Sequence, residues 1–160
     1  MNPTDMPSRF GFHSLPFTRE IRVADRFVHE LYERPREYLR RALDKRMSAA
    51  LIAPAGTGKT TLLRTLMDAL PESRYRVRYV KVTDLSKRDL CREIATAVGA
   101  EPAGTYPTLV RRLQERFAND LDVDAVRPVL FLDDSHGMRP EALGILRILT
   151  NFERQTQGWC

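Results

Sequence analysis

The sequence predicts an α/β fold in which a parallel sheet is flanked by helices. Two short apolar runs, residues 49–53 and 129–132, have the composition of buried strands, and the alternating stretch 75–83 predicts a further strand. Segments with apolar residues at helical spacing separate these strands. Because strands that alternate with helical crossovers form parallel sheets, we expect the strands to end at one common edge.

The composition describes one domain of an ordinary soluble protein. The 160 residues are 42% hydrophobic and 29% charged, and no apolar run reaches the roughly 18 residues needed to cross a membrane. The net charge is 26 − 21 = +5, which mildly favours a polyanionic partner. Cys91 and Cys160 match no metal or redox spacing, and residues 1–8 lack a signal-peptide pattern. We therefore expect a reducing, cytoplasmic location.

The chain is predicted to begin with an extended arm, residues 1–24, followed by one domain over residues 25–160. The arm contains prolines and the aromatic residues Phe10, Phe12 and Phe17. Residues 25–46 show apolar side chains at helical spacing. Pro35 is expected to divide this stretch into two helices, because proline suits the start of a helix and disrupts its interior.

The apolar run 49–53 leads into a glycine-rich loop and then into a helix predicted over residues 60–70. Glycines allow a turn with positive φ that brings backbone N–H groups close to an anion, and a helix N-terminus favours negative charge. In such a loop Lys59 would contact the β- and γ-phosphates of a nucleotide, and Thr60 would hold Mg²⁺. Ala53 replaces the first glycine of the full motif, at a position that closes the strand. The predicted phosphate-binding P-loop consists of Pro54, Ala55, Gly56, Thr57, Gly58, Lys59, Thr60 and Thr61.

Two further helices are predicted in the middle of the chain. Ser86 with Asp89 three residues later resembles a capping box at the start of the first helix, and Gly99 is placed to end it. The second helix has an apolar face formed by Leu109, Leu113 and Phe117. A polar connection over residues 119–127 is expected to follow it, and a last helix is predicted from Pro140.

Two acidic residues, Asp133 and Asp134, follow the apolar run 129–132. A strand that ends in carboxylates puts them at the edge of the sheet where the P-loop also lies. Asp133 would hold Mg²⁺, and Asp134 would orient the attacking water, so the predicted catalytic residues are Asp134 and Lys59. His136 is either a γ-phosphate sensor or a surface residue, and the surface role is favoured.

With these motifs the chain resembles AAA+ ATPases, and more closely the ExeA-like group of secretion-pathway and transposition helper ATPases. The resemblance runs from Phe10 to about Glu153 and includes the P-loop and the segment Leu132-Asp-Asp-Ser-His136. It implies a P-loop NTPase fold of AAA+ type, with ATP and Mg²⁺ as ligands and ATP hydrolysis by the complete domain. Independently of this resemblance, the aromatic residues of the arm are expected either to cover a bound base or to pack on the domain, and packing is favoured.

The chain departs from this family pattern in two places. Asp134 stands where the family usually has glutamate, which sets the carboxylate one methylene back from the water. The sequence also stops after the acid-bearing strand and the following helix, before the family's sensor residue, arginine finger and helical lid. From the resemblance we expect an N-terminal portion of the family domain that binds ATP weakly, turns over negligibly and tends to aggregate.

Three functions are compatible with these motifs. The leading one is a helper ATPase of DNA transposition, with DNA and a transposase as partners and a homo-oligomer as the full-length assembly. Seven Lys/Arg against two Asp/Glu between Arg74 and Arg92 favour DNA, with Arg76 and Arg78 as candidate phosphate contacts. The alternative is a nucleotide-gated interaction module of a secretion assembly that does not bind DNA. A small-molecule kinase is the third, but the paired acids fit an ATPase better.

Overall fold

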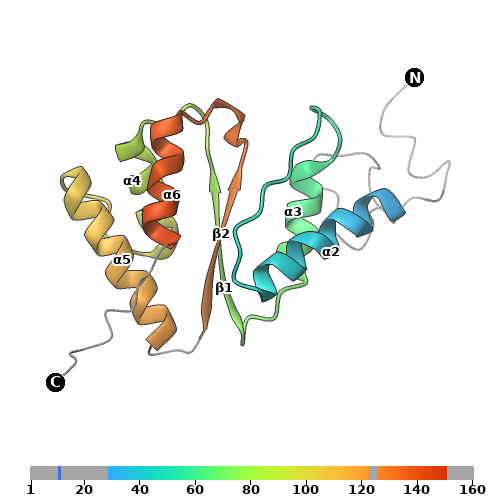
Figure 1. The fold of residues 1–160 in the computed structure, drawn as a ribbon, viewed down its shortest axis with the longest axis horizontal. Coiled ribbons are helices and arrows are strands. Elements are labelled where there is room, and N and C mark those ends of the chain that lie inside the picture. Colours follow the sequence, from blue (N-terminus) through green and yellow to red (C-terminus); the bar gives the residue numbers. More distant parts are fainter. Residues whose placement is uncertain (1–10, 12–28, 123–125, 151–160) are drawn as a thin grey trace. The chain divides into compact units, whose positions relative to one another are not determined.

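The computed structural model describes residues 29–122 and 126–150, together with Gly11 (Figure 1). The chain divides into two compact units, Met1–Asp68 and Ala69–Cys160. The first unit contains helices α2 (Glu30–Asp44) and α3 (Lys59–Asp68). The second unit contains strands β1 (Tyr75–Lys81) and β2 (Arg127–Asp133), helices α4 (Lys87–Val98), α5 (Tyr106–Asp122) and α6 (Pro140–Thr150), and the short 3-10 helix η3 (Ser135–Gly137).

β1 and β2 pair in parallel as a two-stranded sheet flanked by helices, which confirms the predicted fold class. The register places Lys81 opposite Asp133, so both strands end at the same edge. The N–H of Val82 donates to the carbonyl of Asp133 at 2.8 Å and extends the ladder just past the end of β1. β2 confirms the strand predicted over residues 129–132, but its side chains alternate between buried and partly buried, so the strand is not fully buried as predicted.

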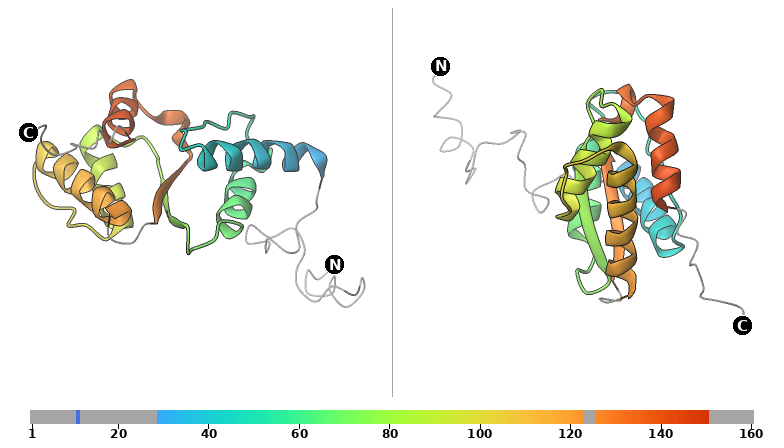
Figure 2. Two further views of the ribbon diagram at one scale, coloured as in Figure 1. Left: turned by 60° about the horizontal axis from the view of Figure 1, so that its bottom comes forward. Right: turned by 90° about the vertical axis from the view of Figure 1, so that its left-hand side faces the viewer.

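Helices α4, α5 and α6 lie against one face of this sheet (Figures 1 and 2). Together they form most of a buried core, to which Val80 in β1 and Val82 just after β1 also contribute. Full burial of a large aliphatic side chain stabilises the fold by about 1.5–3 kcal/mol. The core therefore anchors the edge of the sheet where the acidic residues lie. Its fully buried side chains include Leu90, Ile94, Leu109, Leu113 and Ile145.

α4 begins and ends where the sequence predicts. Ser86 is its N-cap, with a side chain that accepts from the N–H of Asp89, and Gly99 is its C-cap, with a φ angle of 72°. The Asp89 carboxylate accepts from the Ser86 hydroxyl at 2.5 Å, whereas a full capping box would join it to the Ser86 N–H. Because aspartate is shorter than the glutamate of that motif, its carboxylate accepts from the Ser86 hydroxyl and not from the Ser86 N–H.

The prediction of two helices divided at Pro35 is wrong, because α2 continues through this residue. Proline inside a helix costs about 3 kcal/mol, since it removes a hydrogen bond and crowds the preceding turn. His29 caps the first turn, where its Nδ1 accepts from the N–H of Leu31 at 3.1 Å. Ion pairs at helical spacing on both sides of the proline offset a further part of the cost. They are Arg34–Glu30, Arg36–Glu33 and Arg41–Glu37.

The prediction of a buried strand over residues 49–53 is also wrong. The segment belongs to neither strand of the sheet, and Ile52 within it is 92% exposed. A strand needs a neighbour for its backbone donors and acceptors, and none of the described residues pairs with this segment. Apolar composition by itself does not supply that neighbour.

The remaining differences concern where elements end. α5 continues to Asp122 and takes up the first part of the connection predicted over residues 119–127. α3 ends at Asp68, two residues before the predicted end. The arm predicted over residues 1–24 lies outside the described residues, apart from Gly11. In the described part of the chain, no helix is long and apolar enough to span a bilayer.

Candidate functional site

The loop that precedes α3 has the backbone of an anion-binding turn. Gly56 and Gly58 have φ angles of +77° and +81°, which residues with a Cβ rarely adopt. Apart from chain neighbours, no atom lies within 4 Å of the place that a Cβ would take at Gly56. At Gly58 the Tyr32 ring lies 3.1 Å from that place, so this glycine is also needed for packing. The Gly58 carbonyl accepts from the N–H of Leu62 at 2.9 Å, which joins the loop to the first turn of α3.

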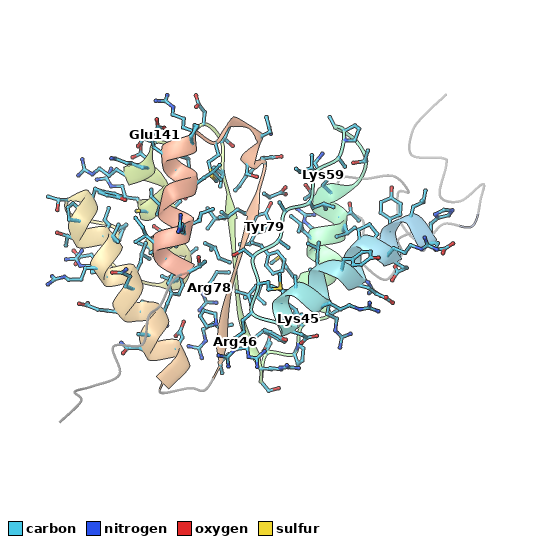
Figure 3. All side chains as sticks on the ribbon, in the orientation of Figure 1. Lys45, Arg46, Lys59, Arg78, Tyr79 and Glu141 are labelled. Carbon is cyan, nitrogen blue, oxygen red and sulfur yellow. The ribbon has the colours of Figure 1, made fainter. Side chains whose placement is uncertain are left out.

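The ammonium group of Lys59 is held by this loop. Its Nζ donates to the carbonyl of Ala53 at 2.9 Å and to that of Pro54 at 2.8 Å. The Thr57 hydroxyl donates to the same Pro54 carbonyl at 2.8 Å. Figure 3 labels Lys59 at the start of α3, where the positive end of the helix dipole adds to its charge.

These loop residues fit the phosphates of a nucleotide. The backbone at Gly56 is open, the charge of Lys59 is in place, and the first turn of a helix presents N–H groups without intrahelical acceptors. Lys59 would exchange two neutral carbonyl acceptors for phosphate oxygens, which form stronger charge-assisted bonds. The contacts of residues 54–61 with phosphate remain a prediction of the motif.

Asp133 ends β2 and lies buried at the carboxyl edge of the sheet, 5% exposed. Its Oδ2 accepts from the Tyr79 hydroxyl at 2.8 Å, and its Oδ1 accepts from the N–H of Asp134 at 2.9 Å. A carboxylate removed from water needs such donors. Among the described residues, no group of three His, Cys, Asp or Glu side chains could hold a metal. A Mg²⁺ ion at Asp133 would therefore take its other ligands from phosphate, water and, as the motif predicts, the hydroxyl of Thr60.

Asp134 has a left-handed backbone, with a φ angle of 56°, and its carboxylate lies 3.3 Å from Nζ of Lys81. Aspartate tolerates this backbone conformation better than most residues. The side chains of Lys81 and Asp134 are 65% and 42% exposed, so the ion pair contributes at most about 1 kcal/mol. The pair leaves Asp134 accessible, and its role in orienting water stays a prediction.

The two loops at this edge of the sheet contact each other. After β1, the backbone nitrogen of Asp84 lies 3.7 Å from the place that a Cβ would take at Gly137. Nε of Arg139 lies 3.9 Å from the Asp84 carboxylate. His136 in η3 is exposed, in agreement with the favoured surface role, while phosphate sensing stays a prediction.

The basic stretch between Arg74 and Arg92 divides into partly enclosed and exposed side chains. Arg76 pairs with the buried Asp120 at 3.2 Å, and Arg78 has a buried Nε. Figure 3 shows Arg78 on the side of the sheet that the helices cover. Both arginines are therefore poor candidates for phosphate contacts. The exposed members of the stretch are Arg74, Lys81, Lys87, Arg88 and Arg92.

Two contacts of the site were not predicted from the sequence, namely those of Tyr79 and Lys81 with the acids. The available signal was the alternation over residues 75–83, which puts both side chains on one face of a strand. The missing information was the register, which places Tyr79 opposite Phe131 and Lys81 opposite Asp133.

The predicted site residues are distributed over both units of the chain. The P-loop, residues 54–61, belongs to the first unit, and Asp133 and Asp134 belong to the second. The Mg²⁺ site that Thr60 and Asp133 would share therefore stays a prediction.

Comparison with known proteins identifies the family. A family model described as "AAA domain" matches residues 40–159, well over half of the chain, including the P-loop and the acid pair. No curated protein and no solved structure matches the chain. Loop geometry, an acid-terminated parallel strand and the family match agree, so the chain belongs to the AAA domain family of nucleotide-binding ATPases.

Proposed function

We propose that this chain binds ATP with Mg²⁺ and serves as a helper ATPase in DNA transposition. The observation that carries nucleotide binding is the position of Lys59, whose ammonium is held by the carbonyls of Ala53 and Pro54 beside two glycines with positive φ. A positive charge in an open glycine loop at a helix N-terminus suits a triphosphate. The membership in the AAA domain family supports the same assignment.

Each residue of the proposed site has one role. Lys59 contacts the phosphates, Thr60 and Asp133 hold Mg²⁺, and Asp134 orients the attacking water. Mg²⁺ would supply charge neutralisation of the phosphates. The Lys81–Asp134 pair is too exposed to prevent the role of Asp134, because such pairs contribute at most about 1 kcal/mol.

The nucleotide part of the proposal is tested by calorimetric titration of Mg-ATP into the wild type and Lys59→Ala. A hydrogen bond from a charged donor contributes about 1.5–3 kcal/mol. Because Lys59 gives up two loop carbonyls when it binds phosphate, we expect the lower end, a loss of about tenfold in affinity. Lys45→Ala, an exposed lysine in the same unit, serves as the matched control and should bind normally. Equal affinities for the wild type and Lys59→Ala would refute the site.

The DNA part of the proposal is supported by exposed basic residues. Lys87 and Arg88 lie in the first turn of α4, and Arg92 follows one turn later. Arg88 uses one N–H on the Gly104 carbonyl at 3.0 Å, which leaves other donors of its guanidinium for phosphate. The net charge of +5 also favours binding to DNA. A transposase and further copies of this chain are the protein partners that the proposal implies.

DNA binding is tested by the salt dependence of affinity for a duplex of arbitrary sequence. The logarithm of affinity should fall linearly with the logarithm of salt concentration, by about 0.9 per phosphate contact. The double variant Lys87→Gln/Arg88→Gln should make this slope shallower by the contribution of about two phosphate contacts. Arg111→Gln, an exposed arginine on α5, is the control and should leave the slope unchanged. Undetectable binding at low salt would instead favour the module of a secretion assembly.

A further inference from the structure

We infer that Tyr79 is a positioning residue for Asp133 and thereby sets the affinity of the site for Mg²⁺. The inference rests on the proposed function, because it concerns the acid that is proposed to hold the metal. Tyr79 lies in the middle of β1 and is no part of the P-loop or the acid pair.

The contact that carries the inference is direct. The Tyr79 hydroxyl donates to Oδ2 of Asp133 at 2.8 Å, across 54 positions of the sequence. The other oxygen, Oδ1, accepts from the N–H of Asp134 at 2.9 Å. These two donors hold both oxygens of the carboxylate in a defined orientation.

The sheet register explains why Tyr79 reaches Asp133. Tyr79 lies opposite Phe131, two residues before Asp133 on the same face of the sheet. Arg78, its neighbour, points to the opposite face (Figure 3). A tyrosine spans the diagonal to Asp133 with its ring and presents the hydroxyl at the end. Phenylalanine at this position would keep the ring but offer no donor.

The hydrogen bond matters because it fixes the orientation of the carboxylate. The last torsion of an aspartate side chain is broad, so an isolated carboxylate can rotate. Mg²⁺ requires near-octahedral oxygen ligands at defined positions. Donors to a metal-binding carboxylate typically change metal affinity or activity by about 10–100-fold. For loss of the Tyr79 hydroxyl we expect the lower end of this range, about a tenfold change in Mg²⁺ affinity. The N–H of Asp134 still holds the second oxygen in that case.

The test compares nucleotide affinity with saturating Mg²⁺ and with EDTA, measured on the full chain with a fluorescent ATP analogue. The ratio of the two affinities reports the metal contribution within each variant. A loss of folded protein lowers both affinities equally and cancels in the ratio. In Tyr79→Phe the ratio should fall by up to about tenfold, while the affinity in EDTA stays unchanged. Tyr75→Phe removes a hydroxyl from the same face of β1, away from Asp133, and should leave the ratio unchanged.

A double variant separates positioning from a general structural effect. In the Asp133→Asn background the effect of Tyr79→Phe on the ratio should vanish, because the carboxylate that Tyr79 orients is gone. An effect of the same size in both backgrounds overturns the inference, and so does a normal ratio in Tyr79→Phe. A ratio of one in the wild type would show that Mg²⁺ adds nothing to nucleotide affinity, and it would overturn the proposed metal role of Asp133 together with the inference. A normal ratio in Tyr79→Phe would overturn the inference alone, so the two failures are distinguishable.

Discussion

The ion pairs of Asp120 give the sharpest test of how the second unit is held together. Asp120, near the end of α5, has a side chain that is 5% exposed and lies 3.2 Å from Arg76 on β1 and 3.5 Å from Arg116. Asp120→Asn keeps the shape of the side chain and removes its charge. The two guanidinium groups would then repel each other without the carboxylate between them.

The size of the effect follows from the burial of the three side chains. Removing one partner of a buried ion pair costs about 3–5 kcal/mol. The side chains of Arg76 and Arg116 are 29% and 37% exposed, so water solvates them in part and the lower end applies. We expect a loss of about 3 kcal/mol in the free energy of unfolding. For a chain of this length, that lowers the melting temperature by about 6–12 °C.

The assay is urea unfolding followed by circular dichroism, with Glu115→Gln as the control. Glu115 lies on the same helix and pairs with Arg111 at 3.8 Å, but both side chains are more than 60% exposed. Such a pair contributes about 0.2–1 kcal/mol, so the control should change little. If Asp120→Asn and Glu115→Gln lower stability by the same small amount, the enclosed ion pair at Asp120 does not exist.

Three other predictions concern α4. Ser86→Ala should lower the free energy of unfolding by about 1 kcal/mol in urea titration through loss of the N-cap, whereas Thr96→Ala, exposed on the same helix, should change it little. Gly99→Ala should cost about 1–2 kcal/mol in the same assay, because the φ angle of 72° strains a residue with a Cβ. Burial raises the pKa of the Cys91 thiol from 9.0 to about 11. Between pH 9 and about pH 11 the thiol of the folded chain keeps a proton that the unfolded chain has lost. The free energy of unfolding should therefore fall as the pH rises from about 9 to about 11, and it should fall less steeply in Cys91→Ala. A pH-independent difference between these two proteins would contradict the burial of the thiol.

Features that depend on a few neighbouring residues could be predicted from the sequence alone. The P-loop, the caps Ser86 and Gly99, and the acids at the end of β2 are of this kind. Their physical causes are local, namely the φ range open to glycine, a side-chain acceptor at a helix start, and the end of an apolar run. Parallel pairing was also predictable, because alternating strands and helices leave few other arrangements.

Features that join distant parts of the chain were decided only by the tertiary structure. The register of β1 against β2 brings Tyr79 and Lys81 to the two acids, and one residue of slip would turn each side chain to the other face. Packing of α5 against the sheet encloses Arg76 with Asp120, although the composition of the stretch favours an exposed basic surface. Residues 49–53 read as a strand, but a strand exists only where a second strand accepts its hydrogen bonds, and that partner is not a property of the segment.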